Sequence, residues 1–545
     1  MLGFAKPQYQ PTNIEVNGFM ELTRRFTPIS LLILSINGMV GSAWLFAPMY
    51  AAKIAGSGAI IAWLIGGFAT AIIALTFAEL SVMFPVAGGS AQIPQISHGT
   101  FTSFNLSWMA WLSALTMAPI EVQAVLQYAS TYFTSLSEMV AGAHHLSNVG
   151  LLWATVLMLA FCIINILSFK GLLRFNLATF LFKVCIILTV IVTLMKHSFH
   201  AVNFDHFSDN FTLTGWQAIL TAVASGGVAF AFTGFKHGVE LAGEAKKYAV
   251  TIPVAIVGSV LCCLLLYIGL QVAFIGALSE ESLAQGWQNL SFVGDVGPFA
   301  GLIAGIGIVW LLKLLYLDAT VSPSGAGLIW VTSTARILYA MGKIGYLPSR
   351  VTRLNKQDFP VTAIFINFFI GMFLFLPFPG WQDMVGFLVS GMVLSYAMGP
   401  ISLLCLRLDM PQKRLFRMPA ANVLCLLAFY FCNLINYWTG WEIMWKLAIA
   451  MLIGLAFFIY GVLTNKIAKE NLGLKSAVWL VPYFGGLVLI SYLGAFGGLN
   501  VIPFGWDFLV IGLFSIVILY LAVKNRAGAS EADFVALQTR PMLAL

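Results

Sequence analysis

Three charged residues lie deep inside long apolar stretches of the sequence. Lys183 and Asp318 are at similar depths in two of these stretches, 173–196 and 298–327, and Glu121 is near the centre of a third. A charge at the middle of a membrane helix costs about 2.5–3.5 kcal/mol by insertion scales, so such residues indicate a function. The chemistry that a buried ammonium and buried carboxyl groups offer is the binding and release of protons.

We predict that Lys183 and Asp318 pair, and that protonation of this pair alternates during the working cycle. Lys183 could instead extend toward the membrane surface and have no coupling role. Glu121 is the alternative proton carrier, because removal from water favours the protonated carboxyl. A permanently neutral Glu121 that only bonds a neighbouring helix is the competing interpretation.

Two glycine-containing stretches, 37–42 (NGMVGS) and 229–234 (AFAFTG), lie well inside apolar segments. Glycine weakens a helix, and backbone groups freed at that depth are tolerated only where they line a cavity or bind something. Paired interruptions in two inverted repeats indicate a small-molecule site near the middle of the membrane. The competing interpretation is that these glycines only allow close helix packing.

Two further lysines, Lys236 and Lys313, are expected close to the same site. Two cations there would suit a ligand that carries a second carboxylate. Alternatively, Lys236 faces a water-filled vestibule and Lys313 pairs elsewhere.

The elements that must position these residues are membrane helices. The chain has 545 residues, of which 60% are apolar or aromatic and only 9% are charged, and its mean hydropathy is +0.92. A soluble domain carries about 25% charged residues. The net charge of +7 comes from scattered residues, so nucleic-acid binding is not expected. The long apolar runs, without short alternating strands, predict an all-α integral membrane protein in a lipid bilayer.

Fourteen segments are long and apolar enough to span a membrane. They lie near 28–52, 58–83, 103–133, 150–168, 173–196, 216–241, 250–277, 298–327, 360–378, 384–406, 420–438, 442–463, 476–497 and 505–523. The apolar stretch 328–346 carries two basic residues and is expected to be the cytosolic end of the eighth segment, running into an amphipathic stretch at the membrane surface. If the segments alternate, 22 of the 28 Lys and Arg residues fall on one side and three on the other. This positive-inside pattern predicts that the tails 1–27 and 524–545 are both cytosolic.

The sequence shows no pattern typical of an enzyme. The first 27 residues contain no apolar core of a signal peptide, and the seven cysteines have no metal-ligand spacing. No nucleophile and base pair or phosphate-binding loop stands out, so we expect neither catalysis nor a bound metal or cofactor.

Four motifs in order resemble those of the APC superfamily of amino acid permeases: NGMVGSAWLFAP at 37–48, FPVAGGS at 84–90, the stretch 229–253 and ARILYAMGKIGYLP at 335–348. The stretches 116–125 and 316–330 look most like bacterial aspartate–proton symporters. The resemblance implies a LeuT-type fold of five-plus-five inverted repeats, with residues 28–196 and 216–406 as the two repeats. Peripheral helices would follow at 420–523, giving a twelve-helix core with two extra C-terminal helices.

The resemblance also implies a substrate site at the two interruptions. The substrate carboxylate would meet backbone N–H groups of the first, at Met39, Val40, Gly41, Ser42 and Ala43. The substrate ammonium would meet carbonyl groups of the second, at Phe230, Ala231 and Thr233, with Lys236 close by and Phe230 also serving as an aromatic gate. The family usually has glycine where this chain has Ala43, which narrows the approach to the backbone. Lys183 would take the place that sodium fills in sodium-coupled relatives, which implies coupling to H⁺.

The expected function is therefore proton-coupled import of aspartate or glutamate by alternating access, across the inner membrane of a bacterium. The alternatives are an amino acid exchanger or a symporter for a neutral amino acid. A channel or a transporter-like nutrient sensor is a further alternative from a different class. The sequence leaves the oligomeric state open.

Overall fold

The computed structural model describes residues 24–140, 143–167, 169–205, 207–290, 297–376, 381–411, 414–467 and 472–530. Apart from 24–27 and 524–530, the two predicted tails lie outside these residues.

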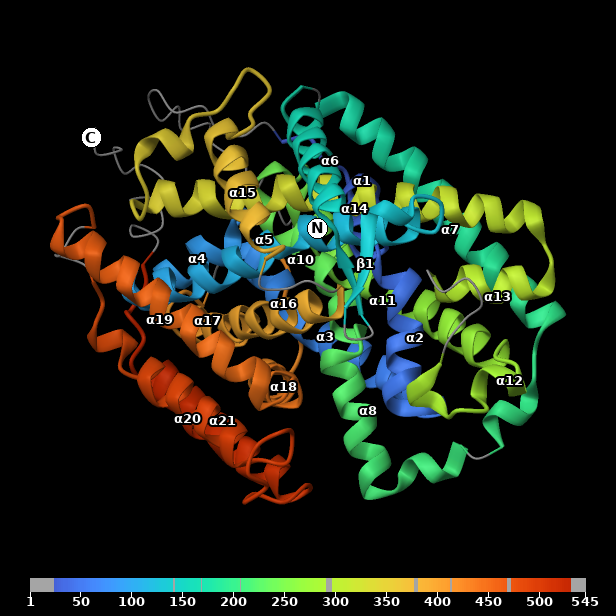
Figure 1. The fold of residues 1–545 in the computed structure, drawn as a ribbon. Helices are drawn as coiled ribbons and strands as arrows, with labels where there is room; N and C mark the ends of the chain where they lie inside the picture. Colours follow the sequence, from blue (N-terminus) through green and yellow to red (C-terminus); the bar gives the residue numbers. More distant parts are fainter. Residues whose placement is uncertain are drawn as a thin grey trace, which may run out of the picture.

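The described chain is almost entirely helical, as predicted (Figure 1). Its α-helices are α1 (Pro28–Met39), α2 (Ala43–Ala55), α3 (Ala59–Met83), α4 (Gly89–His98), α5 (Thr100–Ala129), α6 (Asn148–Leu167), α7 (Phe169–His197), α8 (Leu213–Ser225), α9 (Val228–Ala231), α10 (Lys236–Glu240), α11 (Tyr248–Gly276), α12 (Glu280–Leu283), α13 (Pro298–Ile306), α14 (Val309–Ile344), α15 (Val361–Phe373), α16 (Trp381–Tyr396), α17 (Met398–Asp409), α18 (Ala421–Trp438), α19 (Trp441–Leu463), α20 (Leu480–Leu493) and α21 (Trp506–Lys524). Strands β1 (Ser137–Val140) and β2 (Ala143–Leu146) form an antiparallel hairpin between α5 and α6 that the sequence did not predict.

Within the described residues, eleven helical stretches are long and apolar enough to cross a membrane. Two shorter apolar helices, α1 and α15, lie among them. Large apolar side chains such as Leu265 on α11 and Val481 on α20 are exposed on the outside of the molecule. A continuous apolar exterior of this kind is the surface that lipid chains cover.

The centre of the molecule is built around α5. The apolar span in this helix is 94% buried inside the protein, and α5 packs against α14, α16 and α4. Helices α18 to α21 lie along one side of this core (Figure 1). Helix α18 packs against α3, α16 and α17, and the residues predicted to carry chemistry lie between the start of α1 and the end of α14.

Helix α14 differs from the prediction. It continues without a break to Ile344, through most of the stretch 328–346, which was expected to be the cytosolic end of the eighth segment running into an amphipathic stretch at the membrane surface. Instead, the break lies before it, at Gly307 between α13 and α14, where φ is +81°. Arg336 explains the difference, because its side chain is buried at 1% exposure and forms an ion pair with Glu244, so this part of α14 belongs to the core.

The chain segment after α21 is tied back to the core. Arg526 donates to Asp409 at the end of α17 at 2.7 Å, and this hydrogen bond raises the pKa of Arg526. The backbone N–H of Ala527 donates to the carbonyl of Ser97 in α4. These bonds fix the C-terminal end of α21 to α17 and α4.

Candidate functional site

The first apolar segment is interrupted where the sequence predicted it. Helix α1 ends at Met39 and α2 begins at Ala43, and Val40 has a non-helical ψ of 73°. The N–H of Val40 still bonds the carbonyl of Ile36. The N–H groups of Met39 and Val40 therefore belong to the last turn of α1, and those available to an anion come from Gly41, Ser42 and Ala43.

The carbonyl groups freed at the end of α1 are bound by side chains from three other helices. The Lys183 ammonium, from α7, donates to the carbonyls of Asn37 at 3.3 Å and Val40 at 2.5 Å. Trp330 of α14 donates to the Gly38 carbonyl at 3.2 Å, and Tyr267 of α11 donates to the Met39 carbonyl at 2.8 Å. The buried backbone here is thus satisfied without a ligand, as buried polar groups must be.

The other side of the interruption is bound by a carboxylate. The Ser42 N–H donates to Glu121 Oε2 at 2.7 Å, and both residues are buried. The Ser42 hydroxyl accepts a hydrogen bond from the Trp381 indole at 2.9 Å. The start of α2 therefore has a carboxyl group at the positive end of its helix dipole, where a negative charge is favoured.

The sixth apolar segment is interrupted as well, over a longer stretch than predicted. Helix α8 ends at Ser225, α9 covers only Val228–Ala231, and a short 3₁₀ turn (Thr233–Phe235) leads into α10. The break begins at Gly227, which has φ of +89° and where an added Cβ would lie 2.9 Å from the Ala47 side chain. Within the predicted 229–234 region, the Phe230 carbonyl accepts from the Thr233 hydroxyl at 2.7 Å.

Aromatic rings cover one side of the two interruptions. Trp381 of α16 stacks on Tyr50 at 5.5 Å between ring centroids and meets the edge of Phe230, also at 5.5 Å. Phe46 lies 5.3 Å from the same indole. Phe230 therefore belongs to this aromatic cover, and its role as a gate stays a prediction.

Lys183 and Asp318 are neighbours but do not form the predicted direct ion pair in the described structure. Ser322 lies between them: its carbonyl accepts from Lys183 at 3.4 Å, and its hydroxyl donates to both carboxylate oxygens of Asp318 at 2.8 Å. An ammonium has three N–H donors, and those of Lys183 are taken by the carbonyls of Asn37, Val40 and Ser322. The carbonyls of α1 therefore replace Asp318 as its direct partners.

A family model described as amino acid permease matches residues 26–489. The chain belongs to the amino acid permease family.

Two characterised bacterial proteins are similar to this permease along nearly their whole length. The glutamate/serine transporter AimA of Bacillus subtilis is 37% identical, over 93% of this chain and 94% of its own. The aspartate-proton symporter of the same organism is 31% identical, over 92% of this chain and 97% of its own. The permease is thus a multi-pass membrane transporter, and its relatives are transporters rather than enzymes.

A solved structure of Mhp1, a nucleobase-cation-symport-1 family transporter in a closed conformation, superposes with a TM-score of 0.55. The match covers 95% of the permease and 96% of that chain at 13% identity. At this identity the likeness concerns the fold alone, and it supports the predicted LeuT-like fold.

The two additional lysines of the permease are not placed as expected. Lys236 lies 3.3 Å from Glu240 one helical turn away and sits over the ring of Phe77. Lys313 is exposed on the outside of α14. The charge of Lys236 is therefore already balanced, and Lys313 does not line the site, so these two residues do not form the predicted pair of cations for a second carboxylate.

At the end of the site where α1 begins, four charged residues form what we term the Arg336 cluster: Arg25, Glu244, Arg336 and Asp358. Arg336 forms an ion pair with Glu244 at 2.9 Å, and Arg25 forms one with Asp358. The N–H groups of Arg25 and Phe26 donate to the Glu244 carbonyl. The cluster therefore joins the segment before α1 to the segment after α10 and to α14.

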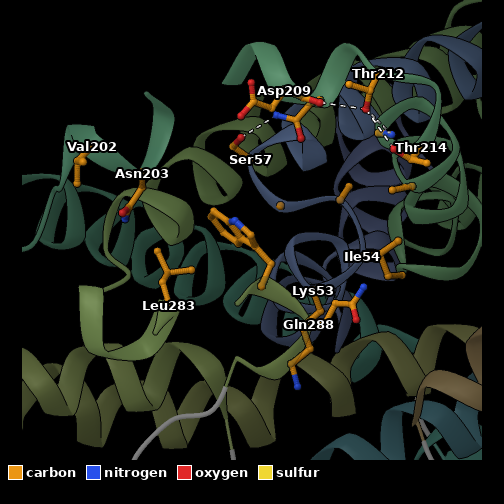
Figure 2. Close-up of a pocket in the computed structure, with 16 residues that line it drawn as sticks. Lys53, Ile54, Ser57, Val202, Asn203, Asp209, Thr212, Thr214, Leu283 and Gln288 are labelled. Atoms are coloured by element: carbon orange, nitrogen blue, oxygen red, sulfur yellow. Dashed lines mark hydrogen bonds between the residues drawn. The ribbon is translucent and has the colours of Figure 1, made fainter. Parts of the chain in front are cut away.

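A cavity of about 580 Å³ lies elsewhere in the permease, at the far end of α2 (Figure 2). Its lining includes Ser57, Asn210 and Trp287, and the Asn210 amide donates to the Ser57 hydroxyl at 2.8 Å. Because a helix rises about 1.5 Å per residue, this end of α2 is roughly 20 Å from Ser42. The cavity is separate from the interrupted helices.

Sequence reasoning missed four residues of the site: Tyr267, Ser322, Trp330 and Trp381. Each has a hydrogen-bond donor inside an apolar helix. A buried Trp or Tyr usually finds a partner for its polar atom, and this was the available signal. It shows that a partner exists without saying which one.

Proposed function

We propose that this permease is a secondary active transporter that imports an acidic amino acid, aspartate or glutamate, together with a proton by alternating access. The observation that carries the proposal is the position of the Lys183 ammonium on the freed carbonyls of α1. The Lys183 ammonium binds these partly negative carbonyl oxygens in place of a metal cation, which favours H⁺ over Na⁺ as the coupling ion.

The substrate contacts follow from the two interruptions. The carboxylate of an amino acid would bind what we term the anion site, the N–H groups of Gly41, Ser42 and Ala43 at the start of α2. The first N–H groups of any helix have no partner within that helix, and the helix dipole favours negative charge there. The ammonium would bind carbonyl groups of the second interruption, at Phe230, Ala231 and Thr233.

The proposed architecture is the one implied by the resemblance. Residues 28–196 and 216–406 would form two inverted repeats of five membrane crossings each, followed by four crossings within 420–523. Broken helices such as α1–α2 and α8–α10 would each count as one crossing. We propose fourteen crossings, both termini in the cytosol, and a location in the inner membrane of a bacterium.

Proton coupling is proposed to involve Lys183 and Asp318 through Ser322, with Glu121 as the alternative carrier. The test is uptake of labelled substrate by Lys183→Ala at several external pH values. Loss of the pH dependence supports the role of Lys183. Uptake that stays fully pH-dependent contradicts it and leaves Glu121 as the candidate.

The choice of an acidic substrate now rests on the relatives, whose names include glutamate and aspartate. The charge argument from the sequence no longer supports it, because Lys236 is paired with Glu240. A small neutral amino acid is the second candidate, since the relative that is 37% identical is named for serine as well as glutamate.

The decisive experiment is uptake into proteoliposomes with imposed pH or Na⁺ gradients, in competition with each of the twenty amino acids. We expect accumulation driven by a pH gradient and competition by aspartate and glutamate. Competition by serine alone would indicate that the substrate is a neutral amino acid. Uptake that requires an amino acid inside the vesicle and ignores both gradients would identify an exchanger.

A further inference from the structure

The start of α2 is capped by a residue from another helix. Ser42 is the N-cap residue of α2, but its side chain makes no capping hydrogen bond. The first turn of α2 contains no acidic residue. Its partner is the carboxyl group of Glu121, which comes from α5 and accepts a hydrogen bond from the Ser42 N–H at 2.7 Å.

This bond uses the same backbone group that the proposed function assigns to the substrate. A backbone N–H has one hydrogen, so it cannot make a full hydrogen bond to two carboxylates at once. Glu121 and the carboxylate of an amino acid are therefore competitors for the Ser42 N–H.

The limited space around Gly41 also indicates that Glu121 and a substrate carboxylate compete for the anion site. A Cβ atom built on Gly41 would lie 2.4 Å from Glu121 Oε1 and 2.7 Å from the Ala326 side chain. The Glu121 carboxylate thus lies directly against the backbone of the interruption, with α14 on the other side. A second carboxylate fits at the anion site only after that of Glu121 has moved away.

We propose that Glu121 is an internal competitor, a tethered carboxylate that occupies the anion site in the absence of substrate and gives it up on protonation. This inference rests on the proposed function, in which the anion site binds the α-carboxylate of an amino acid. A proton from water adds to Glu121, and the neutral carboxyl is a weaker acceptor than a carboxylate. The substrate carboxylate then takes the Ser42 N–H. When the substrate leaves, Glu121 loses its proton and rebinds.

The charged surroundings of Glu121 are compatible with this exchange. Lys183 of α7 and Tyr267 of α11 interact electrostatically with Glu121, and Asp318 of α14 interacts with Lys183. When the substrate carboxylate replaces that of Glu121, the anion site keeps one negative charge near Lys183. The exchange therefore loads one proton with each substrate and leaves the local charge balance of the anion site unchanged.

The test compares L-glutamate with L-isoglutamine, which has an amide in place of the α-carboxylate, and L-serine with L-serinamide. Dissociation constants are measured for the purified full-length permease from about pH 5.5 to about pH 9.5, a range that extends above the pH at which a buried carboxyl ionises. Uptake of one proton on binding predicts an affinity that falls about tenfold for each unit of rising pH once Glu121 is ionised. We expect this slope for glutamate or serine, and weak binding with no slope for the amides.

The matched variants are Glu121→Gln, which keeps the shape but cannot be charged, and Asp507→Asn, which removes a buried carboxyl at the start of α21, away from the anion site. We expect Glu121→Gln to bind the amino acid with less than a twofold change over the same pH range, and Asp507→Asn to keep the slope. A slope that persists in Glu121→Gln overturns the inference.

A second measurement covers the case in which Glu121→Gln does not fold. Proton uptake by the unmodified permease is followed with a pH indicator in weak buffer during binding. We expect close to one proton per L-glutamate or L-serine bound above the pH at which Glu121 ionises, and none with the amides. Equal uptake with the amides, or none with the amino acids, overturns the inference. If the permease binds neither amino acid, the proposed function fails instead.

Discussion

The ion pair between Arg336 and Glu244 is the clearest place to test how α14 is held to the segment after α10. Arg336 is 1% exposed and Glu244 is also 1% exposed. Replacing Arg336 by Met leaves the Glu244 carboxylate buried without its main partner. Breaking a buried pair from one side costs about 3–5 kcal/mol, which is about 100- to 4,000-fold in an equilibrium constant. Arg25 also attracts Glu244, so we expect the lower end of this range.

Hydrogen exchange of backbone amides reports this change directly. The N–H groups of Arg25 and Phe26 bond the Glu244 carbonyl at 2.7 and 3.0 Å, and that of Lys246 bonds the Phe26 carbonyl at 2.8 Å. Local opening of the Arg336 cluster frees these three amides together. We expect them to exchange at least about 100-fold faster in Arg336→Met.

Two controls separate charge from packing. Lys446→Met removes an exposed pair, with Glu442 at 81% side-chain exposure. Such pairs contribute about 0–1 kcal/mol, so exchange at the Arg336 cluster should not change. Adding Glu244→Gln to Arg336→Met removes the unpaired charge and should slow exchange again by tenfold or more. The reasoning is refuted if Arg336→Met leaves these amides protected, or if the double variant exchanges as fast as the single one.

Two further substitutions test the anion site. Gly41→Ala places a methyl 2.4 Å from Glu121 Oε1, so uptake should fall more than tenfold. The control is Gly305→Ala, where an added Cβ meets nothing within 4 Å, and this variant should transport normally. Normal uptake by Gly41→Ala contradicts the described geometry. Trp381→Phe keeps an aromatic ring but loses the hydrogen-bond donor to the Ser42 hydroxyl. Because such a bond contributes about 0.5–1.5 kcal/mol, the KM for uptake should rise about two- to tenfold. An unchanged KM would show that this bond does not position the site.

The sequence predicted the interrupted helices because glycine marks them in an otherwise uniform apolar pattern. At Gly41 the position was right. In the sixth segment the break starts earlier, at Gly227, where two consecutive glycines follow Ser225. This Gly-Gly pair, of which Gly227 adopts a positive φ, was a stronger local signal than the single Gly234 on which the prediction relied.

The side-chain partners were harder to predict, for geometrical reasons. Depth in the membrane does not define which face of a helix a residue occupies. Lys313 and Asp318 are five residues apart, which is roughly 140° around a helix, so burying Asp318 turns Lys313 outward. Lys236 and Glu240 are four residues apart and share a face, and this spacing could have predicted their pairing.

The partners of the freed carbonyls could not be obtained from spacing at all. Trp330 and Tyr267 reach Gly38 and Met39 from sequence separations of 292 and 228 residues. Which helices stand next to one another is a property of the whole fold. The same applies to Ser322, whose position between Lys183 and Asp318 depends on how α7 and α14 pack.

The two helix ends that meet at the first interruption are anchored to different neighbours. The end of α1 is held by side chains of α7, α11 and α14, whereas the start of α2 is held by Glu121 of α5 and Trp381 of α16. Only the backbone of Val40, Gly41 and Ser42 connects these two ends directly, so its few torsions form the joint between them. Farther along α2, Gln271 of α11 donates to the Pro48 carbonyl at 3.1 Å, so α11 binds both halves and limits how far one can tilt without the other.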